Sequence, residues 1–333
     1  MKILLAYCIP FCLTACVTPL VILLAKKCNC IDNPGVRRFH KKATPRWGGL
    51  AFFVGALPFL FLTGIDRQLL SFCIAALLLL VLGMVDDYRP LGWRVKFAGM
   101  IVATTLVVFF GDITVRQIGY YGHFERIELG AFSVPFTYIG IIGVTNTINL
   151  IDGLDGLATG TSLLGFLFMG IAAFLTGNQT LVLMAAVFAG ALTGFMLYNF
   201  PKARIFMGDS GSLFLGFSLS VFCILLTQTG NAEIEPPFAV LVLLIPIFDT
   251  LRVMILRMVN RKNPFHADKS HLHHLIVRKG FSNTSTVILL WALMLLFGSV
   301  AVLLVGRTST TYMVIILSCS LFLSLFADAL ARR

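Results

Sequence analysis

Charged residues are scarce in this sequence, and no segment between its apolar runs is large enough to form a soluble domain. Only 12% of the 333 residues are Asp, Glu, Lys or Arg, while 58% are hydrophobic. The hydrophobic residues form repeated runs, and a helix needs about 20 of them to cross the hydrocarbon core of a bilayer. The sequence therefore predicts an all-α, polytopic integral membrane protein with a single domain over residues 1–333.

Features that define other classes of protein are missing too. The sequence has no internal repeat and no low-complexity segment. The first apolar run, residues 3–25, is too long for a signal peptide and lacks a small-residue cleavage site, so we expect a retained span. The eight cysteines lie mostly inside apolar runs, and Cys28 and Cys30 have no matching second pair, so neither a disulfide framework nor a zinc site is indicated.

The apolar runs predict about eleven (ten or eleven) membrane-spanning helices. We expect them at residues 3–25, 48–65, 68–85, 97–111, 133–149, 158–175, 180–199, 213–229, 238–258, 286–305 and 309–330.

Lys and Arg predict the orientation of these spans. With the N-terminus outside, the inside segments are 26–47, 86–96, 150–157, 200–212, 259–285 and 331–333. Of the 26 basic residues, only Lys2, Arg67, Arg116, Arg126 and Arg307 then face out, which leaves 21 inside when Arg252 and Arg257 are counted with the adjacent inside end. The positive-inside rule favours this orientation. Anionic lipid headgroups therefore explain the net charge of +11, and no nucleic-acid partner is expected.

The first inside loop combines a turn signal at Asp32–Gly35 with a run of basic residues that ends at Arg46. Membrane anchoring explains most of these charges, and some of them could also hold a lipid phosphate or a nucleotide.

A polar stretch, residues 146–157, stands between two apolar runs. It offers the carboxamides of Asn146 and Asn149 and the carboxylates of Asp152 and Asp155 where the chain leaves the membrane. Polar and ionisable groups at a membrane boundary are costly, so such a cluster indicates a functional site. The alternative is a polar loop with Asp as a cap and glycines for the turn.

Two adjacent carboxylates, Asp86 and Asp87, end the third expected span. They repel each other and oppose the helix dipole, so a nearby cation is expected. Mg²⁺ or the downstream Arg94 and Lys96 could supply that charge.

Asp209 lies between two glycines in the segment 206–212, just before an apolar run. The Gly-Asp-Ser-Gly pattern is not a serine nucleophile elbow, because that motif needs a strand-to-helix turn in a soluble α/β sheet. A carboxylate offered to a divalent cation suits the position better.

The last large inside loop contains Arg261, Lys262 and the cluster His271, His273 and His274. The histidine spacing matches no zinc signature, and the oxygen ligands of the other loops favour Mg²⁺, with Mn²⁺ as an alternative. Histidines can instead donate hydrogen bonds to phosphates or to a nucleotide. Asp249, near the inside end of the ninth span, is expected to pair with Arg252 at i+3.

All of these polar motifs are expected on the cytoplasmic face. Carboxylates with cations around them suit a metal-bound polyphosphate, because the cations neutralise charge during phosphoryl transfer. The membrane location indicates that one substrate is a lipid.

The same motifs resemble the four cytoplasmic motifs of the polyprenyl-phosphate N-acetylhexosamine-1-phosphate transferases. They are Asp86–Asp87 with Lys96, the segment 146–157, the segment 206–212 and His271-Leu272-His273-His274. The branch that uses UDP-MurNAc-pentapeptide carries a Pro-x-His-His-His motif in the last loop. This chain is more similar to the branch that transfers GlcNAc-1-phosphate or a related amino sugar to undecaprenyl phosphate. Those enzymes start O-antigen, enterobacterial common antigen, teichoic acid or arabinogalactan-linker synthesis in the bacterial inner membrane.

The resemblance implies a Mg²⁺-dependent transfer from a UDP-N-acetylhexosamine, with release of UMP. It implies Asn149 and Asp209 as metal ligands, Asp86 and Asp87 at the lipid phosphate, and Lys96 as the residue that neutralises phosphate charge. It further implies that Asp152 and Asp155 shape the nucleotide and metal site. Substrate-binding roles fall to Asn146, Arg261, Lys262, His271, His273 and His274.

Several alternatives stay open at the level of sequence. The chain could be a phospho-MurNAc-pentapeptide transferase of the same family, a secondary transporter or a non-catalytic scaffold. Transporters place ionisable residues near the bilayer midplane, whereas those of this chain cluster at one face. The order of steps, direct attack by the lipid phosphate or a phosphoryl-enzyme intermediate, is open, and a homodimer is compatible with the sequence.

Overall fold

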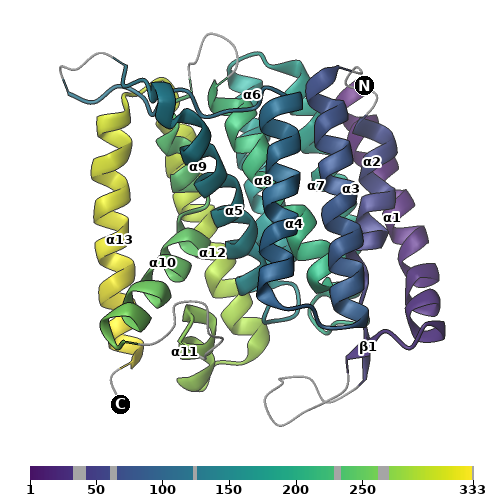
Figure 1. Ribbon diagram of the computed structural model, residues 1–333. Coiled ribbons are helices and arrows are strands. Elements are labelled where there is room, and N and C mark those ends of the chain that lie inside the picture. Colours follow the sequence, from purple (N-terminus) through teal and green to yellow (C-terminus); the bar gives the residue numbers. More distant parts are fainter. Residues whose placement is uncertain (33–42, 61–65, 123–125, 229–233, 262–269, 332–333) are drawn as a thin grey trace.

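The computed structural model describes residues 1–32, 43–60, 66–122, 126–228, 234–261 and 270–331. Long helices run side by side from one end of the molecule to the other, and α1 begins at the end opposite to the one where α13 ends (Figure 1). The helices are α1 (Lys2–Lys27), α2 (Gly48–Leu60), α3 (Arg67–Tyr88), α4 (Trp93–Thr105), α5 (Ser133–Ile151), α6 (Leu157–Leu175), α7 (Gln179–Asn199), α8 (Gly208–Gln228), α9 (Pro237–Val242), α10 (Leu244–Val259), α11 (Leu272–Arg278), α12 (Asn283–Leu303) and α13 (Ser309–Ala331).

Three shorter features complete the description. A π-helical turn, η2 (Leu106–Phe110), extends α4, and a 3₁₀ turn, η3 (Gly130–Phe132), precedes α5. The strands β1 (Ile31–Asp32) and β2 (Thr44–Pro45) pair in antiparallel fashion, with Ile31 opposite Pro45. This two-stranded element is a small departure from the all-α expectation.

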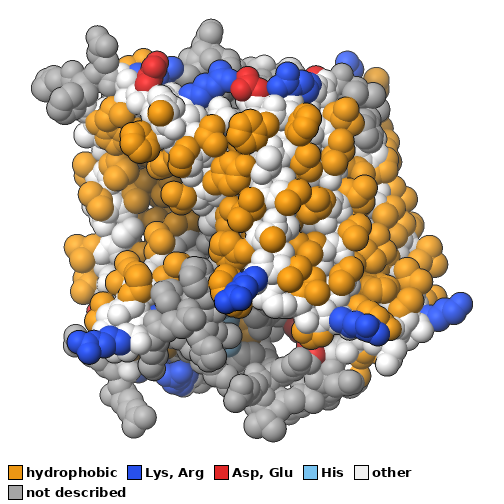
Figure 2. Space-filling view, viewed as in Figure 1, with side chains coloured by type: hydrophobic (Ala, Val, Ile, Leu, Met, Phe, Trp, Pro, Cys, Tyr) orange, Lys and Arg blue, Asp and Glu red, His pale blue; other side chains and the backbone are white. Residues whose placement is uncertain are grey.

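Nine helices among the described residues are long and apolar enough to span a membrane. Their exposed apolar side chains form a broad belt, with charged side chains above and below it (Figure 2). Such a belt matches the hydrocarbon layer of a bilayer flanked by its polar interfaces. The expectation of a polytopic helical protein is therefore confirmed, with nine long spans within the described residues where ten or eleven were expected.

The two remaining expected spans differ from the prediction. The helix α2 has thirteen described residues, and the rest of that expected span, 61–65, lies outside the described residues. The expected span 238–258 is wrong as one helix, because the chain breaks at Leu243 into α9 and α10. Pro246 explains the break, since a proline ring clashes with the carbonyl four residues earlier and tolerates only the first turn of a helix.

The helix α8 occupies the centre of the bundle. Every residue from 210 to 222 is buried, and α8 packs against α2, α3, α5 and α6. Phe214, Phe217 and Phe222 stack on or meet the edges of phenylalanines from neighbouring helices. Gly83 allows α3 to approach the start of α8 closely, because a Cβ there would lie 2.4 Å from the Asp209 carbonyl oxygen. The core therefore fixes the first turn of α8 beside the end of α3.

Candidate active site

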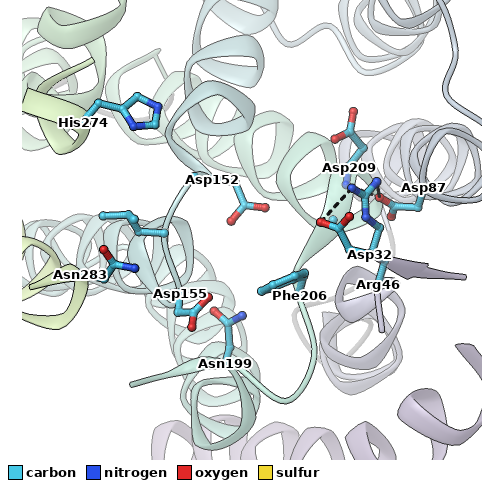
Figure 3. A pocket seen from close by; sticks show the side chains of 13 residues that line it. Asp32, Arg46, Asp87, Asp152, Asp155, Asn199, Phe206, Asp209, His274 and Asn283 are labelled. Carbon is cyan, nitrogen blue, oxygen red and sulfur yellow. Dashed lines mark hydrogen bonds and ion pairs between the residues drawn. The ribbon is translucent and has the colours of Figure 1, made fainter. Parts of the chain in front are cut away.

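The end of the bundle where α3 ends and α8 begins contains a cavity of about 330 Å³. Five carboxylates, one arginine and one histidine line it, together with backbone and amide groups from other loops. The lining residues are Asp32, Arg46, Asp87, Asp152, Gly153, Leu154, Asp155, Asn199, Phe206, Gly208, Asp209, His274 and Asn283 (Figure 3). Segments far apart in the sequence therefore meet as expected, because the helices that carry them end on the same side.

Asp87 caps the central helix. Its two carboxylate oxygens accept hydrogen bonds from the backbone N–H groups of Asp209, at 2.9 Å, and Ser210, at 3.1 Å. The first N–H groups of a helix lack partners within the helix, and a carboxylate there also meets the positive end of the helix dipole. Gly208 makes this contact possible, since its φ is +70° and a Cβ would lie 2.3 Å from the Asp87 carboxylate. Asp87 thus stabilises the start of α8 and also forms part of the cavity wall.

Lys96 connects two of the expected site residues. Its Nζ lies 2.8 Å from Asp209 Oδ2 and 3.4 Å from Asp86 Oδ2. The second oxygen of Asp86 accepts a hydrogen bond from the Leu91 backbone N–H at 2.7 Å, which closes the turn between α3 and α4. The cation expected to relieve the repulsion between neighbouring carboxylates is therefore Lys96 in this structure.

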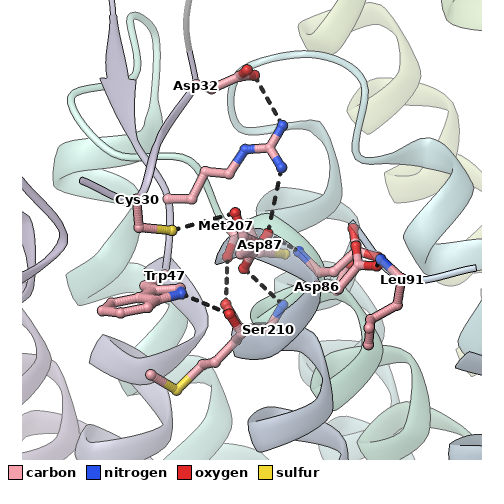
Figure 4. Close-up of polar contacts among 12 residues, drawn as sticks. Cys30, Asp32, Trp47, Asp86, Asp87, Leu91, Met207 and Ser210 are labelled. Carbon is pink, nitrogen blue, oxygen red and sulfur yellow. Dashed lines mark hydrogen bonds and ion pairs between the residues drawn. The ribbon is translucent and has the colours of Figure 1, made fainter. Parts of the chain in front are cut away.

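Arg46 directly follows β2, and its side chain lines the cavity. Its guanidinium lies 3.2 Å from Asp32 and 3.9 Å from Asp87, so it bridges the first inside loop and the end of α3 (Figure 4). Backbone hydrogen bonds hold this segment in place: Phe206 N donates to Pro45 O, and Gly48 N donates to Phe206 O. Among the described residues that line the cavity, Arg46 is the only Lys or Arg.

Asp152 and Asp155 lie in the short loop between α5 and α6. Asp155 Oδ2 accepts a hydrogen bond from Ala203 N at 3.0 Å and so joins this loop to the segment before α8. Asp152 points into the cavity (Figure 3) and has no hydrogen bond or ion pair within the part of the chain that is described. Burial, with the nearby carboxylates of Asp209, Asp87 and Asp155, raises the pKa of Asp152 to about 8. A cation bound nearby would lower the pKa of Asp152 again.

The two asparagines of α5 stand apart from the cavity lining. Asn149 donates from Nδ2 to the Ser212 hydroxyl on α8 at 2.8 Å, one turn beyond Asp209. Its amide oxygen remains an acceptor, as a role beside Asp209 would require. Asn146, on the preceding turn, is half-buried.

The histidine cluster is divided between the cavity and the wall behind it. His274 lines the cavity, whereas His271 Nδ1 lies 2.9 Å from Asp249 Oδ2. The expected pairing of Asp249 with Arg252 is wrong: Arg252 donates to the Ser270 carbonyl at 3.0 Å, and Asp249 also accepts from Leu272 N at 2.8 Å. The histidine segment folds back onto α10 and offers better-placed donors than a neighbour on the same helix.

His273 supports the loop that carries Asp152. It is 2% exposed, and a Cβ on Gly153 would lie 2.7 Å from its Nε2. Burial, with the other two histidines nearby, lowers the pKa of His273 well below its usual value, so the ring is neutral. The His273 ring packs against Gly153, which forms part of the cavity wall.

Of the two basic residues expected in the last inside loop, Arg261 is described and does not line the cavity. Arg261 follows α10, is exposed and has a φ of +54°. Lys262 lies outside the described residues.

A magnesium site can be tested against the donors present. Among the described residues, no three His, Cys, Asp or Glu side chains are grouped so that they alone could hold a metal ion. Mg²⁺ usually takes one or two carboxylates and completes its shell with water and substrate phosphates. Asp209 with oxygen donors beside it fits that pattern, and a closed zinc-type site does not.

Several lining residues are not singled out by the sequence. Asp32 belongs to an expected turn, and Arg46 ends a basic run of which some members could hold a phosphate, without a signal that says which. Arg46 comes directly before Trp47-Gly48-Gly49, where a span begins. Asn199 ends α7, where its amide accepts from Thr159 and donates to the Ile205 carbonyl. No signal in the sequence singles out Asn283.

Comparison with known proteins identifies the family to which this chain belongs. Residues 69–227 match the model of the family described as glycosyl transferase family 4. The chain is 34% identical to a probable undecaprenyl-phosphate N-acetylglucosaminyl 1-phosphate transferase of Bacillus subtilis, over 98% of this chain and 92% of that protein. It is 27% identical to the undecaprenyl-phosphate alpha-N-acetylglucosaminyl 1-phosphate transferase of Escherichia coli K12, over 84% of this chain and 78% of that protein. The acidic cavity at the end of this helical bundle therefore belongs to a multi-pass membrane protein of glycosyl transferase family 4.

Proposed function

We propose that this protein transfers N-acetylhexosamine-1-phosphate, with GlcNAc-1-phosphate as the first candidate, from a UDP-sugar to undecaprenyl phosphate and releases UMP. The observation that carries the proposal is the cavity in which Asp87, Asp152 and Asp209 face Arg46, with Lys96 bound to Asp209. Its position at the end of an apolar bundle suits one substrate from the membrane and one from the aqueous side. The names of the relatives support the same donor and acceptor.

The cations of the site have distinct places in this reaction. Arg46 can bind a diphosphate with its planar guanidinium, which matches phosphate oxygens in pairs. Lys96 stands between Asp86 and Asp209 and can neutralise charge on the phosphoryl group being transferred. Both side chains are held by carboxylates before substrate arrives, so little reorganisation is needed when the phosphates bind.

Asp209 and Asn149 would hold a magnesium ion on the first turns of α8, with Asp152 facing the same space. When bound, such an ion neutralises charge on the diphosphate and on the UMP leaving group. Asp87 keeps the start of α8 in place, and Lys96 orients the Asp209 carboxylate.

The simplest chemistry consistent with the site is direct displacement. An oxygen of the lipid phosphate attacks the phosphorus that carries the sugar, a new P–O bond forms, and the P–O bond to UMP breaks. A phosphate monoester has a second pKa of about 6, so its dianion needs no general base at neutral pH. Asp86 would then orient the acceptor. An Asp86→Ala enzyme that keeps most of its activity at neutral pH would remove Asp86 from this role.

The test is UMP release by purified protein with undecaprenyl phosphate, UDP-GlcNAc and Mg²⁺. We expect release to require the lipid, the metal and Asp209, and to be lost with EDTA or Asp209→Ala. Asp328→Asn, an exposed change on α13, is the matched control and should behave as the parent protein does. A panel of UDP-sugars, UDP-MurNAc-pentapeptide included, would then identify the donor. No release from any member of the panel would contradict the proposal and favour a scaffold or a transporter.

The proposal places the reaction at the cytoplasmic face of a bacterial inner membrane. UDP-sugars are cytoplasmic, and the basic residues predict that the loops around the cavity lie on that side. The product would be the lipid-linked starting unit of an envelope polysaccharide.

A further inference from the structure

Asp249 and His271 form a buried pair that takes no part in the reaction steps proposed above. The Asp249 side chain is 3% exposed, and that of His271 is 5% exposed. Neither residue lines the 330 Å³ cavity. Asp249 instead borders a separate void of about 20 Å³, together with Leu272 and His273. This buried carboxylate and imidazole are in direct contact behind the cavity wall. Any influence on the cavity passes through the segment from His271 to His274, which lines it.

The contact is tied to the position of a proton. An ionised carboxylate only accepts hydrogen bonds, so with Asp249 ionised the 2.9 Å contact places a proton of the His271 ring on Nδ1. The other Asp249 oxygen accepts from Leu272 N at 2.8 Å, which orders the residue that follows. A histidine held in this way has one tautomer and one ring orientation.

A second contact strengthens the same attachment. Arg252, one turn after Asp249 on α10, donates to the Ser270 carbonyl at 3.0 Å. Three hydrogen bonds from α10 therefore hold residues 270–272, where α11 begins. His274 lies in the first turn of that helix and lines the cavity.

We propose that Asp249 and His271 are positioning residues, and that their hydrogen bond sets the start of α11 so that His274 faces the bound UDP-sugar. The role of His271 is carried by its Nδ1–H, and its Nε2 takes no part in binding or chemistry. This inference rests on the proposed function, because it assigns His274 to the nucleotide-sugar side of that reaction.

Two amide substitutions separate the ring nitrogens of His271. The amide nitrogen of Asn lies about as far from the backbone as Nδ1 does, so His271→Asn keeps a donor for Asp249. The longer His271→Gln carries its amide near the position of Nε2 and takes the donor away from Asp249. Asp249→Leu is close to Asp in size and removes both acceptors. Asn is unsuitable at this position, because its amide could donate to Nδ1 of the other His271 tautomer and so keep the contact.

The experiment is steady-state UMP release by the purified full-length variants, with kcat and both KM values measured. We expect His271→Asn to stay within about threefold of the parent protein. His271→Gln and Asp249→Leu should raise the KM for the UDP-sugar about ten- to a hundredfold, the range seen when the hydrogen-bond partner behind a metal-ligating histidine is lost. The KM for undecaprenyl phosphate should not change. Asp328→Asn removes a charge from the exposed face of neighbouring α13 and serves as the control.

Two results would overturn the inference. His271→Asn that is as impaired as His271→Gln would show that Nε2 is needed, and Asp249→Leu with parental kinetics would show that the pair is dispensable. A general loss of folding would reduce the fraction of active enzyme and therefore the measured kcat. It would not selectively raise the KM for the UDP-sugar. If the parent protein itself released no UMP, the proposed function would fail before the pair was tested.

Discussion

Lys96 donates a 2.8 Å hydrogen bond to Asp209, and this contact joins the first turn of α4 to the first turn of α8. The same ammonium group lies 3.4 Å from Asp86 at the end of α3. One cation therefore neutralises two carboxylates from different helices. A divalent cation that binds Asp209 has to share that carboxylate with Lys96.

This sharing predicts opposite effects of Lys96→Gln on metal binding and on catalysis. Without the lysine, a metal ion no longer competes with an ammonium group for the Asp209 carboxylate, so the half-saturating concentration of Mg²⁺ should fall. Turnover should drop by about a hundredfold or more, since a charge that meets the transferred phosphoryl group is lost. Arg94→Gln, an exposed change two residues away, should alter neither quantity. An active Lys96→Gln enzyme with unchanged metal dependence would refute the role given to this residue.

Gly208→Ala should destabilise the protein by more than its backbone conformation alone explains. A left-handed φ costs a side chain about 1–2 kcal/mol, and here the new Cβ would also meet the Asp87 carboxylate at 2.3 Å. Gly177 provides the control, because its φ is +73° and nothing lies within 4 Å of an added Cβ. Thermal unfolding in detergent should show a larger loss for Gly208→Ala than for Gly177→Ala. Equal losses would mean that Asp87 moves aside freely.

Arg46→Gln should weaken binding of the UDP-sugar more than it slows turnover. The guanidinium is held 3.2 Å from Asp32 and faces the cavity, where a diphosphate would meet it. We expect the KM for the UDP-sugar to rise by on the order of tenfold, the loss of one or two charge-assisted hydrogen bonds. Arg46→Lys should restore only part of the affinity, because an ammonium group cannot bind two phosphate oxygens in the planar manner of Arg. Unchanged kinetics for Arg46→Gln would limit Arg46 to holding the loop.

Asp152 makes the stability of the metal-free protein depend on pH. An unfolded Asp releases its proton near pH 4, whereas burial and the neighbouring carboxylates raise the folded pKa of Asp152 to about 8. Between these values the folded state binds more protons, so its contribution to stability is greatest at low pH and is lost as pH rises through 8. Asp152→Asn should remove the contribution of this residue to the pH dependence of stability.

The comparison is made with midpoints of thermal unfolding at pH 5 and pH 8 in EDTA. Asp152→Asn should be more stable than the parent protein at pH 8, and this advantage should shrink at pH 5. The exposed Asp328→Asn should show the same small difference at both values. An advantage that does not vary with pH would contradict the assignment to Asp152.

The orientation of the bundle can be tested independently of activity. The basic residues predict an N-terminus outside and a C-terminus inside. A fluorescent protein that matures only in the cytoplasm should therefore fluoresce when fused after Arg333 and stay dark when fused before Met1. The opposite pattern would move the acidic cavity to the outer face and exclude a cytoplasmic sugar nucleotide as its substrate.

Most of the fold could be predicted from the sequence, because an apolar run of about 20 residues has few alternatives to a membrane-spanning helix. The long helices lie where the runs predict them, and the charged motifs lie at one end. The span at 238–258 was wrong, since a local effect of Pro246 broke a run that hydropathy alone reads as continuous.

The amino-acid sequence alone shows which side chains carry charge at the ends of helices, and those charges are costly enough there to indicate a site. Their partners follow from the packing of the helices. Lys96 faces Asp209 across 113 positions, and Asp249 binds His271 in place of Arg252. Such contacts depend on how helices pack around α8 and on which donors that packing brings within hydrogen-bonding distance. A pattern along the chain predicts which face of a helix a residue occupies, but the residue that meets it across the bundle is set by packing.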